Sequence, residues 1–335
     1  MSSPVGDDIE VDGTGQVRLV VVVIPVRDEV DRVAACLDAL SLAIAELATS
    51  VSPLAVGPRV RTVVVLDRCT DGTAQVVASY PWVETVTSDA GRVGAARALG
   101  VRAALGTEIL PPQSIWVATT DADSRVPPDW LRRQLDHATQ GVDLFRGLVE
   151  PDPTECGSAA YDAWSRAYVR ADGHAHVHGG NLGVRADAYQ VCGGFDQLAA
   201  LDEDVALTRA AQLRSLRVVA SAQAPVATSG RLRSRVEGDG FAGYLRRLAD
   251  APTGEDSKSA PRWRGQPLGG STRSRGSVMG TDDKVSNKID ELKGKAKELE
   301  GKATDDEARE AQGKGEQSKA DLKQAGEKVK DAFKN

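Results

Sequence analysis

Carboxylate side chains follow three short apolar runs of this chain, at the point where each run ends. They are Asp28 and Glu29 after the run 19–24, Asp67 and Asp71 after the run 63–66, and Asp121 and Asp123 after the run 115–119. Carboxylates that meet at one place repel one another unless a cation lies between them. Mg²⁺ and Mn²⁺ prefer one or two carboxylates together with phosphate oxygens, so the pattern favours a divalent metal that binds a phosphorylated ligand.

A simpler interpretation exists for each motif taken alone. The segment from Asp67 to Thr73 contains Asp, Thr and Gly, which routinely turn a chain and cap a helix. The Asp-x-Asp spacing of Asp121 and Asp123 also occurs by chance. The metal interpretation therefore needs support from the elements around these motifs.

The apolar runs predict the strands of a parallel sheet. The runs 19–24, 63–66 and 115–119 are continuous rather than alternating, which is typical of strands that are buried on both faces. Helical spacing follows the first run at Val33, Cys36, Leu37 and Leu40, and a second helix is expected after Thr73. Strand and helix alternate, so we expect an α/β fold with a ligand crevice at the carboxyl ends of the strands.

Seven motifs occur in an order that resembles family 2 glycosyltransferases. They are the segments 23–29, 66–73, 91–97, 121–123, 179–185, 193–196 and 202–204, and the resemblance spans roughly residues 18–248. It implies a GT-A fold, which is a Rossmann-like, mostly parallel sheet flanked by helices. It also implies a nucleoside-diphosphate sugar donor, UDP- or GDP-linked, and Mn²⁺ or Mg²⁺ as cofactor.

The resemblance also assigns roles on the donor side. The nucleotide-sugar-binding residues that it implies are Pro25, Arg27, Glu29, Asp67, Arg92, Arg97, Asp121 and Ala122. Asp67 would contact the base or ribose and Asp121 the ribose, while Arg92 would lie against the base or phosphates, with Arg97 as the weaker candidate. Asp123 would hold the metal that bridges the diphosphate.

The acceptor hydroxyl needs a base, and the resemblance places it within Asp202-Glu203-Asp204. Asp204 is the first candidate, with Asp202 and Glu203 as alternatives; the simpler interpretation is an acidic first turn of a helix around 204–213. Four further residues could contact the acceptor or a phosphate: His178, Asn181, Arg231 and Arg235. His174, His176 and His178 alternate as a zinc ligand set could, but neighbouring Gly and Ala favour a solvated loop. Trp130 is expected in the core.

These observations predict a metal-dependent, inverting, non-processive glycosyltransferase of hexosyltransferase type. The segment 229–236 contains Arg but lacks the Gln/Arg-x-x-Arg-Trp pattern of processive synthases, and no apolar run reaches membrane-spanning length. Arg231 and Arg235 could clamp the diphosphate or form a basic loop that contacts a membrane peripherally. The alternative is a catalytically inactive nucleotide-sugar-binding or regulatory protein with a stress-related tail.

Lysine usage marks a boundary late in the chain. Of 13 lysines, 12 lie between Lys284 and Lys334, in a tail that resembles CsbD-like stress-response proteins. We therefore expect a disordered N-terminus at 1–16, a GT-A domain at 17–250 with a nucleotide-sugar half (17–125) and an acceptor half (126–250), a flexible linker at 251–278, and a marginally helical or disordered tail at 279–335.

Charge and cysteine usage exclude other classes. The net charge of −6 lacks the basic excess of nucleic-acid-binding proteins. The four cysteines form no Cys-x-x-Cys pair, and the polar, acidic start of the chain is unlike a signal peptide. The expectation is a cytoplasmic protein.

Overall fold

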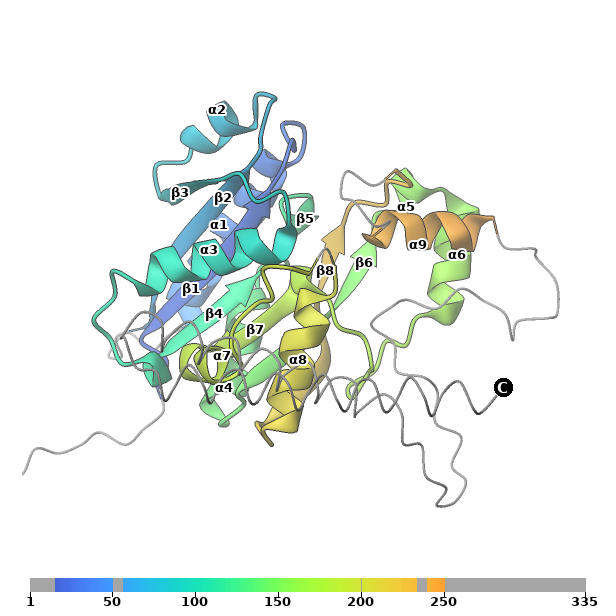
Figure 1. Cartoon of the computed structure of the whole chain (residues 1–335). Coiled ribbons are helices and arrows are strands. Elements are labelled where there is room, and N and C mark those ends of the chain that lie inside the picture. Colours follow the sequence, from blue (N-terminus) through green and yellow to red (C-terminus); the bar gives the residue numbers. More distant parts are fainter. Residues whose placement is uncertain (1–15, 51–56, 200, 234–239, 251–335) are drawn as a thin grey trace, which may run out of the picture. The chain divides into compact units, whose positions relative to one another are not determined.

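The computed structural model describes residues 16–50, 57–199, 201–233 and 240–250. Within these ranges, eight strands form one sheet with the order β3-β2-β1-β4-β7-β6-β8-β5 (Figure 1). The strands are β1 (Leu19–Val26), β2 (Arg59–Asp67), β3 (Val83–Ser88), β4 (Ile115–Thr119), β5 (Ser124–Arg125), β6 (Leu144–Pro151), β7 (Leu182–Arg185) and β8 (Val218–Thr228). The predicted N-terminus, linker and tail lie outside the described residues, apart from Gln16.

The first four strands are parallel, as the apolar runs predict. β2 pairs in parallel with β1 and β3, and β4 pairs in parallel with β1. The second half is mixed, because β7 is antiparallel to β4 and β6, and β8 is parallel to β6 but antiparallel to β5. The α/β prediction is therefore confirmed: β1 to β4 are all parallel to their neighbours among these four strands, whereas the rest of the sheet is mixed. β3 is a half-exposed strand that the sequence analysis did not predict.

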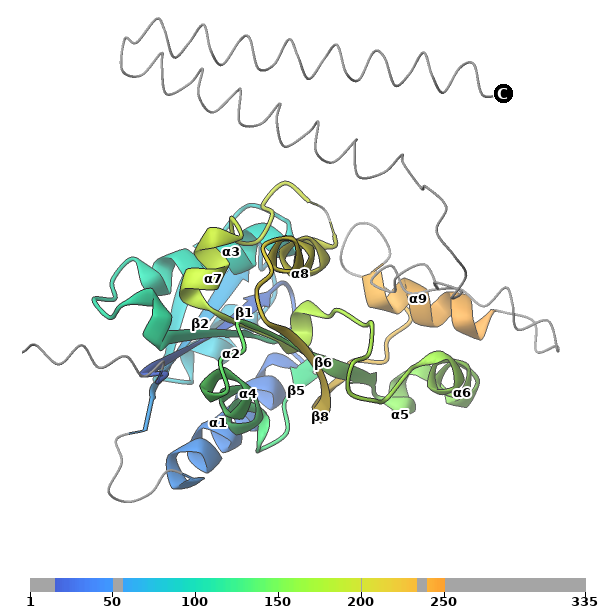
Figure 2. The same ribbon diagram turned by 90° about the horizontal axis from the view of Figure 1, so that it is seen from below.

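Helices cover both faces of this sheet. They are α1 (Val33–Ser50), α2 (Thr73–Ala78), α3 (Val93–Leu105), α4 (Trp130–Thr139), α5 (Pro153–Cys156), α6 (Ser158–Ala167), α7 (Ala186–Val191), α8 (Glu203–Leu213) and α9 (Gly240–Ala249), with short 3₁₀ turns η1 (Pro112–Ser114) and η2 (Gly179–Asn181). In Figure 2, α1 and α4 lie on one side of the sheet and α3, α7 and α8 on the other.

The apolar sequence of strand β1 is explained by its burial on both faces. Side chains of a strand alternate between faces, so Val20, Val22 and Ile24 pack in the core beneath α1 and α4. Leu19, Val21 and Val23 pack in the core on the opposite face, beneath α3. A continuous apolar run is what a strand requires when helices cover both of its faces.

Helix α1 is long and apolar enough to cross a membrane by length and composition alone. In the described structure one of its faces is buried against the sheet through Val33, Cys36, Leu37, Leu40, Ala43 and Leu47. Such one-sided burial is typical of a core helix in a globular domain.

A third, smaller core joins α6 and α9 beyond the ends of β6 and β8 (Figure 1). Trp164, Tyr244 and Leu245 are among its most buried members. This unit places α9 beside the carboxyl ends of the central strands, where the predicted crevice lies.

Candidate active site

A pocket of about 260 Å³ lies at the carboxyl ends of β1, β2 and β4. This is the edge at which parallel strands deliver their following residues to one place. Most of the residues predicted from the sequence line it: Pro25, Arg27, Glu29, Asp67, Arg97, Asp121, Ala122, Asp123, His178, Asp202, Glu203, Asp204 and Arg231. The fold therefore brings together residues that are up to 206 positions apart, from Pro25 to Arg231.

Three predicted residues do not join them. Arg92 is exposed just before α3 and is not among the lining residues. Asn181 is fully buried; it accepts a bond from Trp130 Nε1 at 2.9 Å and donates to the carbonyl of Leu148 at 2.8 Å. Its position is that of a core amide rather than an acceptor contact, and Trp130 is the core residue that was predicted. Arg235 lies outside the described residues.

The pocket also contains residues that the sequence analysis did not single out. Thr228 and Ser229 end β8, and Phe241 and Arg247 lie on α9. Their signal in the sequence is weak because none of the four belongs to a recognisable motif. The amphipathic pattern of α9, with Tyr244, Leu245 and Leu248 buried, is the one local indication that this helix packs beside the site.

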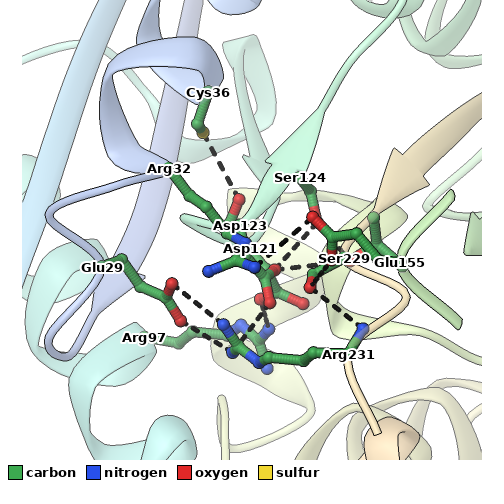
Figure 3. Close-up of polar contacts among 11 residues, drawn as sticks. Glu29, Arg32, Cys36, Arg97, Asp121, Asp123, Ser124, Glu155, Ser229 and Arg231 are labelled. Carbon is green, nitrogen blue, oxygen red and sulfur yellow. Dashed lines mark hydrogen bonds and ion pairs between the residues drawn. The ribbon is translucent and has the colours of Figure 1, made fainter. Parts of the chain in front are cut away.

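Asp123 and Glu29 share one arginine (Figure 3). Arg231 Nη2 lies 2.7 Å from Glu29 Oε1 and 2.9 Å from Asp123 Oδ2, and Nη1 lies 3.0 Å from Glu29 Oε2. Burial raises the pKa of Asp123 to about 6, although the Arg231 charge opposes that rise. The strand ends therefore concentrate negative charge here, and a cation neutralises it.

The two carboxylates of the segment from Asp67 to Thr73 lie in different environments. Asp71 Oδ1 accepts bonds from the backbone N of Thr73 at 2.9 Å and from its hydroxyl at 2.5 Å, at the start of α2. This is the turn-and-cap role. Asp67 instead lines the pocket, where its Oδ1 accepts a bond from Gly91 N at 3.0 Å. Asp71 therefore has the role of the simpler interpretation, whereas Asp67 lies in the pocket and its contact with a nucleotide stays a prediction.

Arg97 is buried inside the pocket wall rather than directed into solvent. Its guanidinium pairs with Asp121 and with Glu203, and its side chain is 4% exposed. Burial would lower the pKa of Arg97, but the charges of Asp121, Glu203 and Asp204 raise it above its ordinary value. Arg97, not Arg92, is therefore the α3 arginine at the site, and it joins the end of β4 to the start of α8.

The three adjacent acidic residues have different environments at the start of α8. Asp202 is exposed, with φ of 69°. Glu203 is buried against Arg97. Asp204 is half-buried at the pocket, where its two oxygens accept bonds from Gly179 N at 2.5 Å and Val205 N at 2.8 Å. Burial and the neighbouring Glu203 charge raise the pKa of Asp204 to about 7.

The expectation of a solvated histidine loop is wrong. His174, His176 and His178 are all buried, and they stack beside Tyr168, whose ring is 4.0 Å from that of His176. The cause is the small core of α6 and α9, which supplies aromatic surface that the local sequence does not reveal. Within the described ranges no group of three His, Cys, Asp or Glu side chains is arranged to hold a metal, so the zinc interpretation is not supported.

This buried cluster predicts acid sensitivity. Burial, together with neighbouring histidine charge, lowers the pKa of His176 to about 4 and that of His178 to about 3, from 6.5. His176 Nε2 accepts a bond from Val169 N at 3.2 Å, which protonation would break. Below pH 6.5 the histidines of the unfolded chain bind protons, whereas those of the folded cluster stay neutral. The contribution of the cluster to the free energy of unfolding is therefore fully present above pH 6.5 and is lost as the pH falls below it.

We expect urea titrations between pH 6.5 and pH 4 to reveal a loss of about 1.4 kcal/mol per pH unit for each histidine that stays neutral. His176→Phe should reduce this slope while it keeps the stacking on Tyr168. The slope is the relevant readout, because phenylalanine also loses the bond from Val169. An unchanged slope in His176→Phe would contradict this assignment.

Two families match separate stretches of this chain. Residues 21–168 match the family described as glycosyl transferase family 2, and residues 283–335 match the family described as CsbD-like. Both matches fall within the stretches for which the sequence predicted these resemblances. No curated protein matches the chain.

Several solved structures are similar in fold. TarS 1–349 of S. aureus in complex with UDP is 14% identical, with a TM-score of 0.45, over 69% of this chain and 64% of that chain. The mannosyltransferase PcManGT from Pyrobaculum calidifontis, in complex with GDP-Man and Mn²⁺, is 19% identical, with a TM-score of 0.43, over 70% of this chain and 61% of that chain. The match thus spans less than two thirds of the length of each of these two solved structures.

Proposed function

We propose that the protein is a metal-dependent, inverting glycosyltransferase that moves one sugar from a nucleoside-diphosphate sugar to an acceptor hydroxyl. One observation carries the proposal. A single pocket of the family 2 domain contains Asp123 beside a neutralising cation and, on its other wall, Asp204 with a pKa raised to about 7. The first arrangement suits a diphosphate and its metal, and the second suits a base.

The donor would bind along the strand ends. Asp67 and Asp121 present carboxylate oxygens that accept hydrogen bonds from a base or a ribose hydroxyl. Pro25 and Arg27 line the same part of the pocket from the end of β1. Either UDP or GDP suits this chemistry, so the binding experiment below is designed to identify the nucleotide.

Asp123 and Glu29 are the residues that would hold a divalent metal. Their carboxylates converge on one nitrogen of Arg231, so both face the same small volume. Mn²⁺ and Mg²⁺ need only one or two carboxylates when the substrate phosphates complete the coordination. A bound metal would stabilise the negative charge of the departing diphosphate.

Asp204 would act on the acceptor. It takes the proton of the acceptor hydroxyl, whose oxygen forms a bond to the anomeric carbon while the bond from that carbon to the diphosphate oxygen breaks. A single displacement of this kind inverts the anomeric configuration. Glu203 is unsuited to this role because Arg97 pairs with it inside the wall, and Asp202 is the outermost of the three.

Binding of nucleoside diphosphates tests the donor half of the proposal. UDP or GDP should bind the full chain with Mn²⁺ at least about tenfold more tightly than without it, and Asp123→Asn should remove that gain. Asp129→Asn, which removes a carboxylate paired with Arg132 and Arg133 away from the pocket, is the control. Isothermal titration calorimetry measures both, and binding that is indifferent to Mn²⁺ would overturn the metal role.

Turnover separates the proposal from its alternative, an inactive nucleotide-sugar-binding protein. Hydrolysis or transfer of the matching nucleotide sugar, followed by release of the diphosphate, is the expected result. Tight Mn²⁺-dependent binding without any release would favour the binding protein instead.

A further inference from the structure

We infer that Arg231 is an internal cation that a metal must displace, so that the protein disfavours metal binding until a diphosphate arrives with it. The inference rests on the proposed function and adds a residue that couples the binding of metal and donor. It comes from the placement of one guanidinium between two carboxylates (Figure 3).

Arg231 contacts the two carboxylates that would bind a metal ion, and it occupies the position of that cation. Its Nη2 lies 2.7 Å from Glu29 Oε1 and 2.9 Å from Asp123 Oδ2. The Glu29 and Asp123 side chains are 7% and 16% exposed. Two carboxylates this close and this buried need a counter-charge, and the guanidinium supplies it. A metal bound to the same oxygens and the guanidinium exclude each other.

Two nearby arginines are engaged elsewhere. Arg97 is held by Asp121 and Glu203 inside the wall, and Arg32 pairs with Glu155 at 3.4 Å, so neither can replace Arg231 without breaking contacts of its own. Arg231 is the arginine that contacts both Glu29 and Asp123 in the described structure.

The backbone around Arg231 is anchored, whereas its side chain reaches across the pocket. Ser229 N donates to the Asp123 carbonyl at 3.1 Å, and the Ser229 hydroxyl donates to Glu155 at 2.5 Å. Arg231 lies two residues later and three beyond the end of β8. Rotation about its side-chain bonds can therefore move the charge while the chain stays in place. A guanidinium released from two carboxylates next to a diphosphate finds new anionic oxygens that match its geometry.

Binding of Mn²⁺ alone is the direct test, because it involves no turnover. We would follow free Mn²⁺ by electron paramagnetic resonance as the full chain is added, first without nucleotide and then with UDP or GDP. Wild type should bind Mn²⁺ alone weakly. Arg231→Gln should bind it more tightly, by a factor of about ten or more, because two carboxylates lose their counter-charge. The added nucleotide should therefore improve Mn²⁺ binding less in the variant than in wild type.

Arg125→Gln is the matched control. It removes the same charge two residues from Asp123, but Arg125 is half-exposed and pairs with Asp152 at 3.0 Å. Its affinity for Mn²⁺ should equal that of wild type. Circular dichroism confirms that each variant is folded. If Arg231→Gln is not folded, Arg231→Lys takes its place in the experiment. A lysine amine cannot reproduce both contacts of the guanidinium to Glu29, so this variant should also raise the affinity for Mn²⁺.

The results separate this inference from the proposed function. Unchanged or weaker Mn²⁺ binding in the folded Arg231 variant, or an equal gain in Arg125→Gln, overturns the inference. Failure of every form to bind UDP or GDP with Mn²⁺ overturns the proposed function, while the comparison made with Mn²⁺ alone still judges Arg231.

Discussion

Asp204→Asn is expected to lower kcat for sugar transfer by about 10²–10⁴-fold, which is the range for loss of a general base. The amide has the size of the carboxylate and can keep an accepted bond from Gly179 N or Val205 N, but it cannot take a proton from the acceptor. The dissociation constant of the donor should stay within about twofold, because the donor contacts proposed here come from other elements.

The pH dependence of transfer provides a second check on Asp204. Since its pKa is raised to about 7, the rate should fall as the pH drops below that value and the carboxylate becomes protonated. Asp202→Asn is the control, because Asp202 is the exposed neighbour. Equal losses of kcat in the two variants, or a loss of donor binding in Asp204→Asn, would contradict the division of roles.

Arg97→Met is expected to destabilise the fold by about 3–5 kcal/mol, the usual cost of removing one partner from a buried ion pair. The variant leaves Glu203 buried without a counter-charge, and Asp121 loses its contact as well. Gly179 lies directly against the Arg97 guanidinium, because a Cβ at that position would collide with it. Urea unfolding at pH 7 measures the loss.

Two further variants test the origin of this loss. Arg97→Met combined with Glu203→Met should recover part of the stability, because the stranded charge is gone. Arg61→Met removes an arginine that pairs with half-exposed Glu84 and bonds the Ala104 carbonyl and the Thr107 hydroxyl, and it should cost clearly less than Arg97→Met because it leaves Glu84 accessible to water. A loss in Arg97→Met as small as that of Arg61→Met would show that Arg97 does not hold the wall together.

The part of the site at the ends of β1, β2 and β4 could be predicted because the strands and their ends follow from local sequence patterns. The apolar runs 19–24, 63–66 and 115–119 became β1, β2 and β4, whose alternate side chains fill cores on both faces. Parallel strands place their following residues at one edge. Asp67, Asp121 and Asp123 therefore had to lie near one another once the strands were recognised.

The partners of the charged side chains could not be predicted in this way. The family resemblance offers both Arg92 and, as the weaker candidate, Arg97, yet only the burial of α3 on the sheet directs Arg97 into the wall. Glu203 and Asp204 are adjacent in sequence, but one meets Arg97 and the other meets the backbone of Gly179. These differences depend on side-chain direction and on burial, which sequence spacing does not specify.

Residue types and their order in the chain thus determined the α/β class, the edge that carries the pocket and the acidic chemistry found there. Packing determined which charges neutralise one another, as with Arg231 and Glu29, and it buried the three histidines against Tyr168. The physical reason is that strand and helix periodicity are set by neighbouring residues. The free energy of a buried charge or ring is instead set by whichever distant segments surround it.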